Sequence, residues 1–161
     1  MQACRTGSAD AFGEIFDRHR SAVWGFFRRR ITDRARAEDL MQDTFVALLK
    51  STGRYDARDA FRSFLFGIAY NVLSEHRRTA RHAPGDDGLI ASVPAQTADL
   101  AEVLTVRRAI AELDAIDRDV LLLREFESLA YAEIADALGI PLNTVRSRLF
   151  RARMALKEKL Q

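Results

Sequence analysis

The sequence predicts an all-α protein made of two small helical domains joined by a linker. Apolar residues recur at spacings of three and four over most of the chain, as on the buried face of a helix. No run alternates apolar with polar residues for long enough to form a half-buried strand. Residues 79–100 break the helical period with two of the three prolines and two of the eight glycines, which is typical of a linker.

The helical pattern divides into seven segments, three before the linker and four after it. Leu89, Ile90 and Val93 are apolar residues that a purely flexible linker does not need, so we expect them to dock on another part of the assembly. The expected helices are 9–31, 34–51, 60–81, 100–113, 116–126, 131–138 and 142–159, with ends uncertain by two to four residues.

Composition indicates a soluble globular protein. The 161 residues are 48% hydrophobic and 30% charged, a balance that disordered and fibrous chains lack. No apolar stretch approaches the roughly 18 residues of a membrane span, and the N-terminus lacks the layout of a signal peptide. We therefore expect a cytoplasmic protein with no membrane contact of its own. The single Cys4 excludes an internal disulfide.

Charge is unevenly distributed although the net charge is only +2. Residues 1–82 carry five more basic than acidic side chains, residues 83–100 carry only acidic ones, and residues 101–161 are balanced. Within the last segment, positions 143–157 hold four Arg and one Lys and no acidic residue. Such a polarised segment favours a module with one face toward phosphates, although a merely solvated basic helix has the same composition.

The stretch YAEIADALGIPLNTVRSRLF, residues 131–150, has the pattern of a helix-turn-helix. Gly139 tolerates the left-handed backbone that ends a helix. Pro141 disfavours helix at the residue before it, and we expect Asn143 or Thr144 to cap the next helix with a side-chain oxygen.

The second helix of this motif has an apolar stripe and a basic outer side. Val145, Leu149, Ala152 and Leu156 recur at spacings of four, three and four, so they face the rest of the domain. Arg reaches phosphates or guanine, and short polar residues allow close approach to a groove. An ordinary helical hairpin with a solvated basic face remains the alternative. The candidate duplex-facing residues are Asn143, Thr144, Arg146, Ser147, Arg148 and Arg151, and Phe150 and Met154 point the same way.

The N-terminal half contains two informative helices. In residues 33–50 the inner stripe comprises Ala37, Leu40, Met41, Thr44, Phe45 and Leu48. The opposite side carries Asp39, Gln42 and Asp43, which are either solvated or form a dock for a basic partner. In residues 59–81 aromatic and basic residues occur together, as single-stranded nucleic acid requires, but Phe at helical spacing is usually core.

We find no pattern of a catalytic or metal site. The three His have no metal-ligand spacing with Cys4, no glycine-rich phosphate loop is present, and no nucleophile sits beside a base in the sequence. We therefore expect no enzymatic activity and no cofactor.

Three ordered motifs together resemble a known family. They are AEDLMQDTFVALL, FRSFLFGIAYNVLSEHRR and LAYAEIADALGIPLNTVRSRLFRARMAL, with the linker after the second. This order resembles the sigma-70 family of RNA polymerase sigma factors, and specifically its short extracytoplasmic-function (ECF) group. The resemblance extends from about residue 11 onward. It implies a sigma-2 domain at residues 1–82, a linker at 83–100 and a sigma-4 helix-turn-helix domain at 101–161.

The resemblance also implies partners and roles. The face with Asp39, Gln42 and Asp43 would bind the clamp of core RNA polymerase, and residues near the Phe61 helix would read the melted minus 10 strand. The sigma-4 helix would read the minus 35 element as duplex through Arg146, Ser147 and Arg151, while the linker would run toward the RNA exit path. A possible further partner is an anti-sigma factor. The residues matching the minus 10 site are Tyr55, Asp56, Ala57, Arg58, Asp59, Ala60, Ile68, Asn71, Arg77 and Arg78.

The chain departs from the family pattern at a few turns. Phe64 replaces the usual Trp, Asp114 replaces the usual Pro, and Ser128 replaces the usual Gly, so local turns are in question rather than the DNA face. Two rival functions remain open at this point. One is a free-standing helix-turn-helix regulator, which would bind duplex DNA alone. The other is a sigma-like decoy that binds polymerase or an anti-sigma factor without directing transcription.

Overall fold

The structure, a computed structural model, describes residues 9–51, 60–80 and 100–161, and these ranges contain helices and turns but no strand. The all-α prediction is therefore confirmed for the part of the chain described. The expected linker at 83–100 and the apolar residues Leu89, Ile90 and Val93 lie outside it. The helices are α2 (Ala9–Arg28), α3 (Arg34–Ser51), α4 (Phe61–Ala80), α5 (Leu100–Ala111), α6 (Ala115–Glu125), α7 (Tyr131–Leu138) and α8 (Leu142–Leu160).

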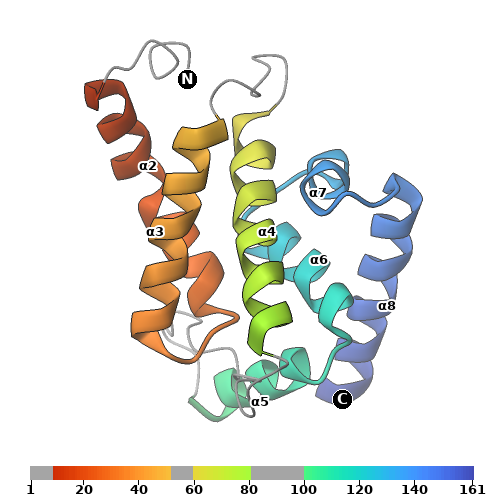
Figure 1. The fold of residues 1–161 in the computed structure, drawn as a ribbon. Helices are drawn as coiled ribbons and strands as arrows, with labels where there is room; N and C mark the ends of the chain where they lie inside the picture. The colour runs from red at the N-terminus through yellow and green to blue at the C-terminus, as the bar shows by residue number, and fades with distance from the viewer. Residues whose placement is uncertain (1–8, 52–59, 81–99) are drawn as a thin grey trace.

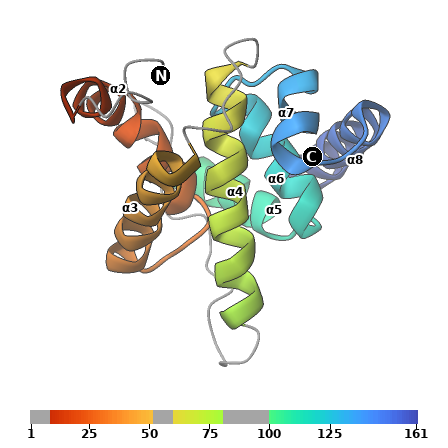
Figure 2. The same ribbon diagram turned by 45° about the horizontal axis from the view of Figure 1, so that its top comes forward.

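Helix α4 stands between the two halves of the chain (Figures 1 and 2). Helices α2 and α3 pack on one side of it, and the C-terminal helices lie on the other side, where α7 makes the most extensive contact with α4. Helix α8 packs on α5, α6 and α7. The two halves therefore meet along α4 instead of standing apart.

The first helix ends three residues earlier than expected, at Arg28. The Arg28 guanidinium donates to the carbonyl oxygens of Ile31, at 2.9 Å, and Thr32, at 2.7 Å, and so satisfies acceptors in the turn that follows. Asp33 then caps α3, because its carboxylate accepts from the backbone amide of Ala35 at 2.9 Å. This compact turn brings α3 back antiparallel to α2.

The apolar stripe predicted for α3 from helical spacing is buried, since all six of its residues are buried. In α4, Leu65, Phe66 and Leu73 have no exposed surface, whereas Phe61, Phe64, Ile68 and Val72 are only half-buried. The buried residues of both halves form a single apolar cluster, which sequence periodicity did not predict. Its fully buried large side chains include Phe26, Phe27, Leu48, Leu65, Phe66, Leu73, Leu122, Leu123, Leu129, Ile134 and Leu149.

Two turns of the C-terminal half depend on the residues that depart from the family pattern. Asp114 caps α6, since its side chain accepts from the backbone amide of Ile116 at 3.2 Å. Ser128 has a φ of 53°, a left-handed conformation that glycine adopts without strain. The Asp substitution therefore suits its turn, whereas the Ser substitution strains it.

Candidate nucleic-acid interface

Helices α7 and α8 and the turn between them form the predicted helix-turn-helix. Helix α7 ends at Gly139, whose φ of 64° confirms the expected left-handed conformation. The amide of Ile140 donates to the Ala135 carbonyl at 3.0 Å and closes the turn. Val145, Leu149 and Ala152 form the buried side of α8, as predicted for its inner stripe. The opposite side of α8 is therefore the exposed one.

The prediction that Asn143 or Thr144 caps α8 is wrong. The helix begins at Leu142, and Pro141 is the residue before it, with extended backbone angles and no side-chain cap. The Pro141 carbonyl accepts from the amide of Thr144 at 2.9 Å, which places Thr144 inside the first turn. The fixed φ of proline suits this position, so the helix starts two residues earlier than it would with Asn143 as its cap.

The outer face of α8 presents polar, basic and apolar side chains. Among the predicted duplex-facing residues, Thr144 and Arg148 are half-buried and the others are exposed. Asn143 accepts a hydrogen bond from Arg146 at 3.2 Å. Phe150 is 67% exposed and Met154 is 40% exposed, which confirms that both point outward. The face can reach a groove with arginine side chains and a short serine.

Acidic residues at the start of α6 form ion pairs with two arginines of this basic face. Asp117 is buried and accepts from Arg148 at 2.9 Å and from Arg151 at 3.3 Å. Asp114 also lies 3.4 Å from Arg148. Sequence reasoning missed these partners, because helical spacing within α8 carries no information about which residues of α6 face it. These ion pairs restrict the orientation of Arg148 and Arg151 from the inner side of the candidate face.

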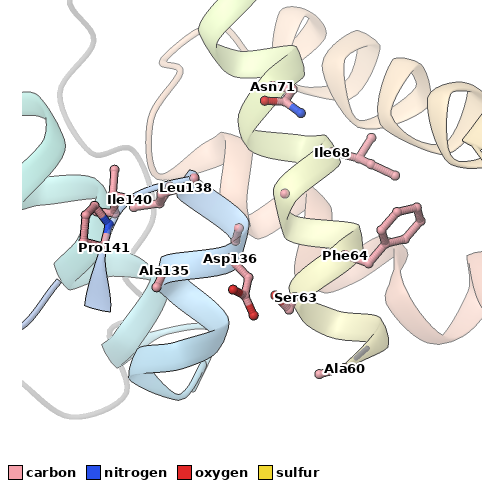
Figure 3. Close-up of a pocket in the computed structure, with 13 residues that line it drawn as sticks. Ala60, Ser63, Phe64, Ile68, Asn71, Ala135, Asp136, Leu138, Ile140 and Pro141 are labelled. Atoms are coloured by element: carbon pink, nitrogen blue, oxygen red, sulfur yellow. The ribbon is translucent and has the colours of Figure 1, made fainter. Parts of the chain in front are cut away.

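The candidate strand-reading residues on α4 line a groove (Figure 3). The groove has a volume of about 950 Å³ and runs between α4 and the segment from Ala135 to Pro141. Ala60, Ile68 and Asn71 contribute to its wall, with Asn71 exposed and Ile68 half-buried. The other expected minus 10 loop residues, Tyr55, Asp56, Ala57, Arg58 and Asp59, lie outside the described residues.

The two arginines near the end of α4 have different surroundings. Arg78 is exposed and pairs with Glu75 on the same helix at 2.6 Å. Arg77 instead reaches Asp119 of α6 at 2.6 Å. Arg77, which the sequence predicts to contact DNA, therefore forms an ion pair with a carboxylate from the other half of the chain.

The outer side of α3 is a mixed acidic and apolar surface. Asp39, Gln42 and Asp43 are exposed, as the sequence predicts for a docking face. Val46 is 48% exposed and Leu49 is 45% exposed, and their spacing continues the same side of the helix. We call these five residues the α3 outer face. The two apolar members were not predicted, although their position one and two turns beyond Gln42 could have indicated them.

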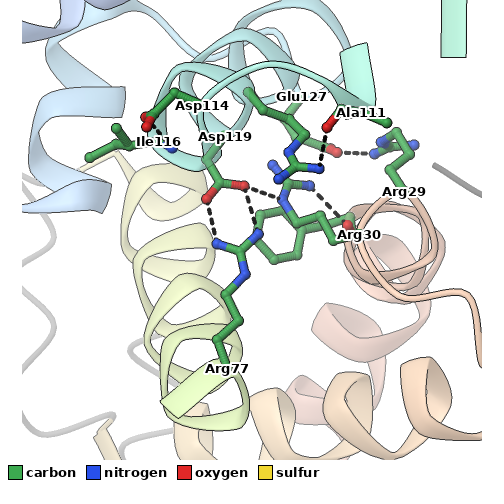
Figure 4. A network of polar contacts seen from close by, with 10 residues as sticks. Arg29, Arg30, Arg77, Ala111, Asp114, Ile116, Asp119 and Glu127 are labelled. Atoms are coloured by element: carbon green, nitrogen blue, oxygen red, sulfur yellow. Dashed lines mark hydrogen bonds and ion pairs between the residues drawn. The ribbon is translucent and has the colours of Figure 1, made fainter. Parts of the chain in front are cut away.

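Buried ion pairs connect the two halves (Figure 4). Arg30 of the α2–α3 turn donates to Asp119 at 2.8 Å, and both side chains are 1% exposed. Arg29 pairs with Glu127, and the Arg62 guanidinium donates to the Glu127 carbonyl oxygen at 2.6 Å. Burial opposes ionisation of Asp119, but Arg30 and Arg77 outweigh it and hold the pKa of this carboxyl below its ordinary value.

The described residues contain no group of three or more His, Cys, Asp or Glu that could hold a metal ion. Within the same ranges, no helix combines the length and apolar character needed to cross a membrane.

The sequence matches two family models. One is described as Sigma-70 region 2 and matches residues 15–83, and the other is described as Sigma-70, region 4 and matches residues 104–156. The chain is 32% identical over 165 residues to the RNA polymerase sigma factor CarQ of Myxococcus xanthus, covering 99% of this chain and 95% of CarQ. It is also 32% identical over 177 residues to the RNA polymerase sigma-H factor of Pseudomonas aeruginosa, covering 100% and 92% of the two chains.

Solved structures share the arrangement of helices. CnrH, in complex with the cytosolic domain of CnrY, matches with a TM-score of 0.72 and 26% identity over 99% of this chain and 93% of CnrH. The sigma factor RpoE of Bartonella quintana, in complex with the anti-sigma factor NepR, matches with a TM-score of 0.76 and 26% identity over 94% and 98%. A likeness confined to one half of the chain would cover much less, so the similarity includes how the halves sit together.

Proposed function

The chain belongs to the sigma-70 family, in its extracytoplasmic-function group, and we propose how its residues divide the work of promoter recognition. Family membership makes it a sigma factor that binds core RNA polymerase and promoter DNA and promotes transcription initiation. We assign residues 1–82 to the sigma-2 domain, 83–100 to the linker and 101–161 to the sigma-4 domain. Sigma factors are initiation factors and not enzymes, and we propose that this chain acts in the cytoplasm without catalytic activity or a cofactor.

The α3 outer face is the proposed contact with polymerase. It is exposed over its whole length, and it combines the carboxylates of Asp39 and Asp43 with the apolar surface of Val46 and Leu49. The exposed apolar side chains at the C-terminal end of this face gain from burial in an interface, whereas its acidic N-terminal end selects a basic partner. This composition supports a stable protein contact better than it supports binding to DNA.

Helix α4 and the loop before it are the proposed minus 10 reader. Asn71 is exposed and can hydrogen-bond a base edge, and the half-buried Ile68 and Phe64 provide apolar surface beside it. A base removed from the stack needs both kinds of contact to compensate for lost pairing and stacking. Arg78 lies exposed farther along the same helix, where it can reach the backbone of the strand.

The exposed face of α8 is the proposed minus 35 reader. Arg146, Ser147 and Arg151 project from a helix whose opposite side is locked into the domain. Arginine at such positions can make paired hydrogen bonds to guanine or bind phosphate oxygens. Asp117 supports this role because it holds the guanidinium of Arg151 from the inner side.

The observation that carries the proposal is the order of sigma-70 regions 2 and 4 along one short chain, each with an exposed face of suitable chemistry. The test is initiation by core RNA polymerase on a promoter of this factor. We expect Asn71→Ala to weaken promoter melting without changing core binding, and Asp43→Asn to weaken core binding. Glu14→Gln, an exposed acid on α2, is the matched control. Equal loss of melting and core binding in Asn71→Ala would contradict the assignment.

A partner of the anti-sigma class is also proposed. RpoE of Bartonella quintana was solved with the anti-sigma factor NepR, and this chain shares its arrangement over nearly the full length. Pull-down of the chain with proteins encoded beside its gene tests the idea, since a specific binder should prevent association with core polymerase. A binder that leaves polymerase association intact would not be an anti-sigma factor.

A further inference from the structure

One buried carboxylate holds two arginines of the candidate duplex-facing side of α8. Asp117 lies in the first turn of α6, and its side chain is only 11% exposed. Its Oδ1 accepts from Arg148 at 2.9 Å and from Arg151 at 3.3 Å. The two arginines are three positions apart, so they lie on the same side of α8, which packs along α6 (Figure 1). A single residue of α6 therefore influences two basic residues of this face.

The two arginines are held to different degrees. The Arg148 side chain is 26% exposed, and it also lies 3.4 Å from Asp114. Its Nε is buried without a hydrogen-bond partner among the described residues. The Arg151 side chain is 57% exposed and contacts Asp117 through Nη2. Because a guanidinium carries five N–H donors, this contact leaves donors for the two acceptors of guanine. Arg148 is thus enclosed within the domain, whereas Arg151 is tethered but able to reach a base.

A carboxylate at this position opposes binding to phosphates. Its negative charge partly cancels two positive charges that would otherwise attract the DNA backbone. Its effect on base recognition is the opposite, because paired hydrogen bonds to guanine require one orientation of the guanidinium, and less rotamer freedom is lost when that orientation is already set. Without the carboxylate, a mobile Arg151 can bind the nearest phosphate instead. Asp117 therefore favours recognition of a base over general attraction to the duplex.

Another ion pair between the same two helices lacks this property. Arg153 of α8 lies 2.9 Å from Glu125 of α6, but the two side chains are 51% and 50% exposed. Water screens an exposed pair of this kind and leaves both side chains mobile. Glu125 consequently carries the same charge as Asp117 on the same helix without fixing an arginine, which makes it a matched control.

We propose that Asp117 is a positioning residue that determines base specificity at the minus 35 element. It retains Arg148 inside the domain as a structural residue, and it orients Arg151 for paired hydrogen bonds to one guanine, while it lowers the affinity for DNA of any sequence. This inference deepens the proposed function and rests on it for the identity of α8 as the duplex reader.

Base preference and general affinity for DNA can be measured separately. The full chain is bound to core RNA polymerase and mixed with duplex fragments of a promoter mapped by transcription from genomic DNA. In one library the minus 35 element is randomised, and sequencing of the bound fragments gives the base preference at each position. A second fragment with a scrambled minus 35 element, titrated at several salt concentrations, gives the affinity that does not depend on that element.

The two measurements should change in opposite directions in Asp117→Asn. We expect the preference for guanine at one position to fall by about fivefold or more, the lower end of what a paired contact contributes. Binding to the scrambled fragment should be as tight as with the parent or tighter, and its log-log salt slope should steepen by about 0.9 for each arginine released to a phosphate. Glu125→Gln, which removes the same charge, should keep the parent's preference at every position. Asp117→Ser, which removes the carboxylate in a different way, should repeat the result of Asp117→Asn.

The outcomes separate this proposal from the proposed function. An unchanged guanine preference in both Asp117 variants would overturn the proposal. Equal weakening on the selected and the scrambled fragments would also overturn it, because the carboxylate would then serve only the folding of the domain. Arg151→Lys keeps the charge but loses the paired contact, so it should lose the same guanine preference. If it keeps that preference, Arg151 is not the base reader, and the proposed function of α8 fails together with the role of Asp117.

Arg148→Lys tests the structural half of the proposal without altering Asp117. Lysine keeps the charge and can pair with the same carboxylates, so we expect the base preference to be unchanged at every position and the salt slope to be unchanged as well. Lysine cannot replace arginine in a paired contact to a base. Loss of preference at any position would therefore show that Arg148 reads a base, and it would overturn the assignment of this arginine to the interior.

Discussion

Replacing Ser128 by glycine should stabilise the protein, since Ser128 has the only positive φ of a non-glycine residue within the described ranges. A side chain in the left-handed region costs about 1–2 kcal/mol. Glycine removes that cost but loses about 0.5–1 kcal/mol through its greater freedom in the unfolded chain. Ser128 is exposed, so little packing is lost. The expected net gain is about 0.5–1 kcal/mol in the free energy of unfolding.

Gly139 provides the opposite case. Its φ is 64°, and a Cβ added there meets nothing within 4 Å, so the effect of Gly139→Ala is purely conformational. We expect the free energy of unfolding to fall by about 0.5–1 kcal/mol. Alanine bears the cost of a side chain in the left-handed region, and its smaller freedom in the unfolded chain offsets only part of that cost. Ser128→Ala keeps the Cβ and should change stability little, which makes it the matched control.

Urea unfolding and thermal unfolding of the full chain measure both changes. For a protein of this size, 1 kcal/mol corresponds to a shift in Tm of about 2–4 °C. A gain from Ser128→Ala equal to that from Ser128→Gly would exclude backbone strain as the cause, since it would assign the effect to the serine hydroxyl. A Gly139→Ala variant as stable as the parent would likewise contradict the left-handed backbone at the helix-turn-helix.

Three further predictions concern the α3 outer face, the DNA face and pH. Leu49→Ser should weaken core polymerase binding while changing stability by less than about 0.5 kcal/mol, because Leu49 is exposed; unchanged binding in a pull-down would argue against this face. Arg146→Ala should weaken promoter binding by about 1–3 kcal/mol and lower the salt slope by about 1, whereas Arg108→Ala on α5 should do neither. Burial, and then the charges of Arg62 and Arg18, lower the pKa of His19 in the folded protein. The folded state therefore favours the neutral imidazole. Its contribution to stability is present above about pH 6.5 and is lost as the pH falls through the folded pKa. His19→Asn should flatten that loss in urea titrations between about pH 7 and 5, and an unchanged pH profile would exclude His19 as its source.

Local signals in the sequence predicted the helices and much of the core. Six of the seven expected helices agree with the structure within two residues at each end, and the other, α2, ends three residues early. The buried α3 stripe and the left-handed Gly139 follow from spacing and from the backbone preference of a single residue. Such features depend on neighbours in sequence, which is why pattern alone identifies them.

The features that were missed depend on residues far apart in sequence. Arg30 and Asp119 are 89 positions apart, and nothing in either helix pattern pairs them. The partner of Arg77 is likewise in the other domain, so a residue predicted to contact DNA is held by a carboxylate here. The start of α8 at residue 142 was predicted correctly, but its capping residue was misjudged for a local reason. Proline and asparagine both suit the end of a turn, and the extended backbone of Pro141 makes it the residue before the helix.

The role of the chain as a sigma factor is tested most directly by transcription on genomic DNA fragments with bacterial core RNA polymerase and the purified chain. A sigma factor should give discrete start sites that share two short upstream elements, with spacing near that of the minus 35 and minus 10 positions. Start sites that are the same with and without the chain, under conditions where the chain binds polymerase, would contradict it.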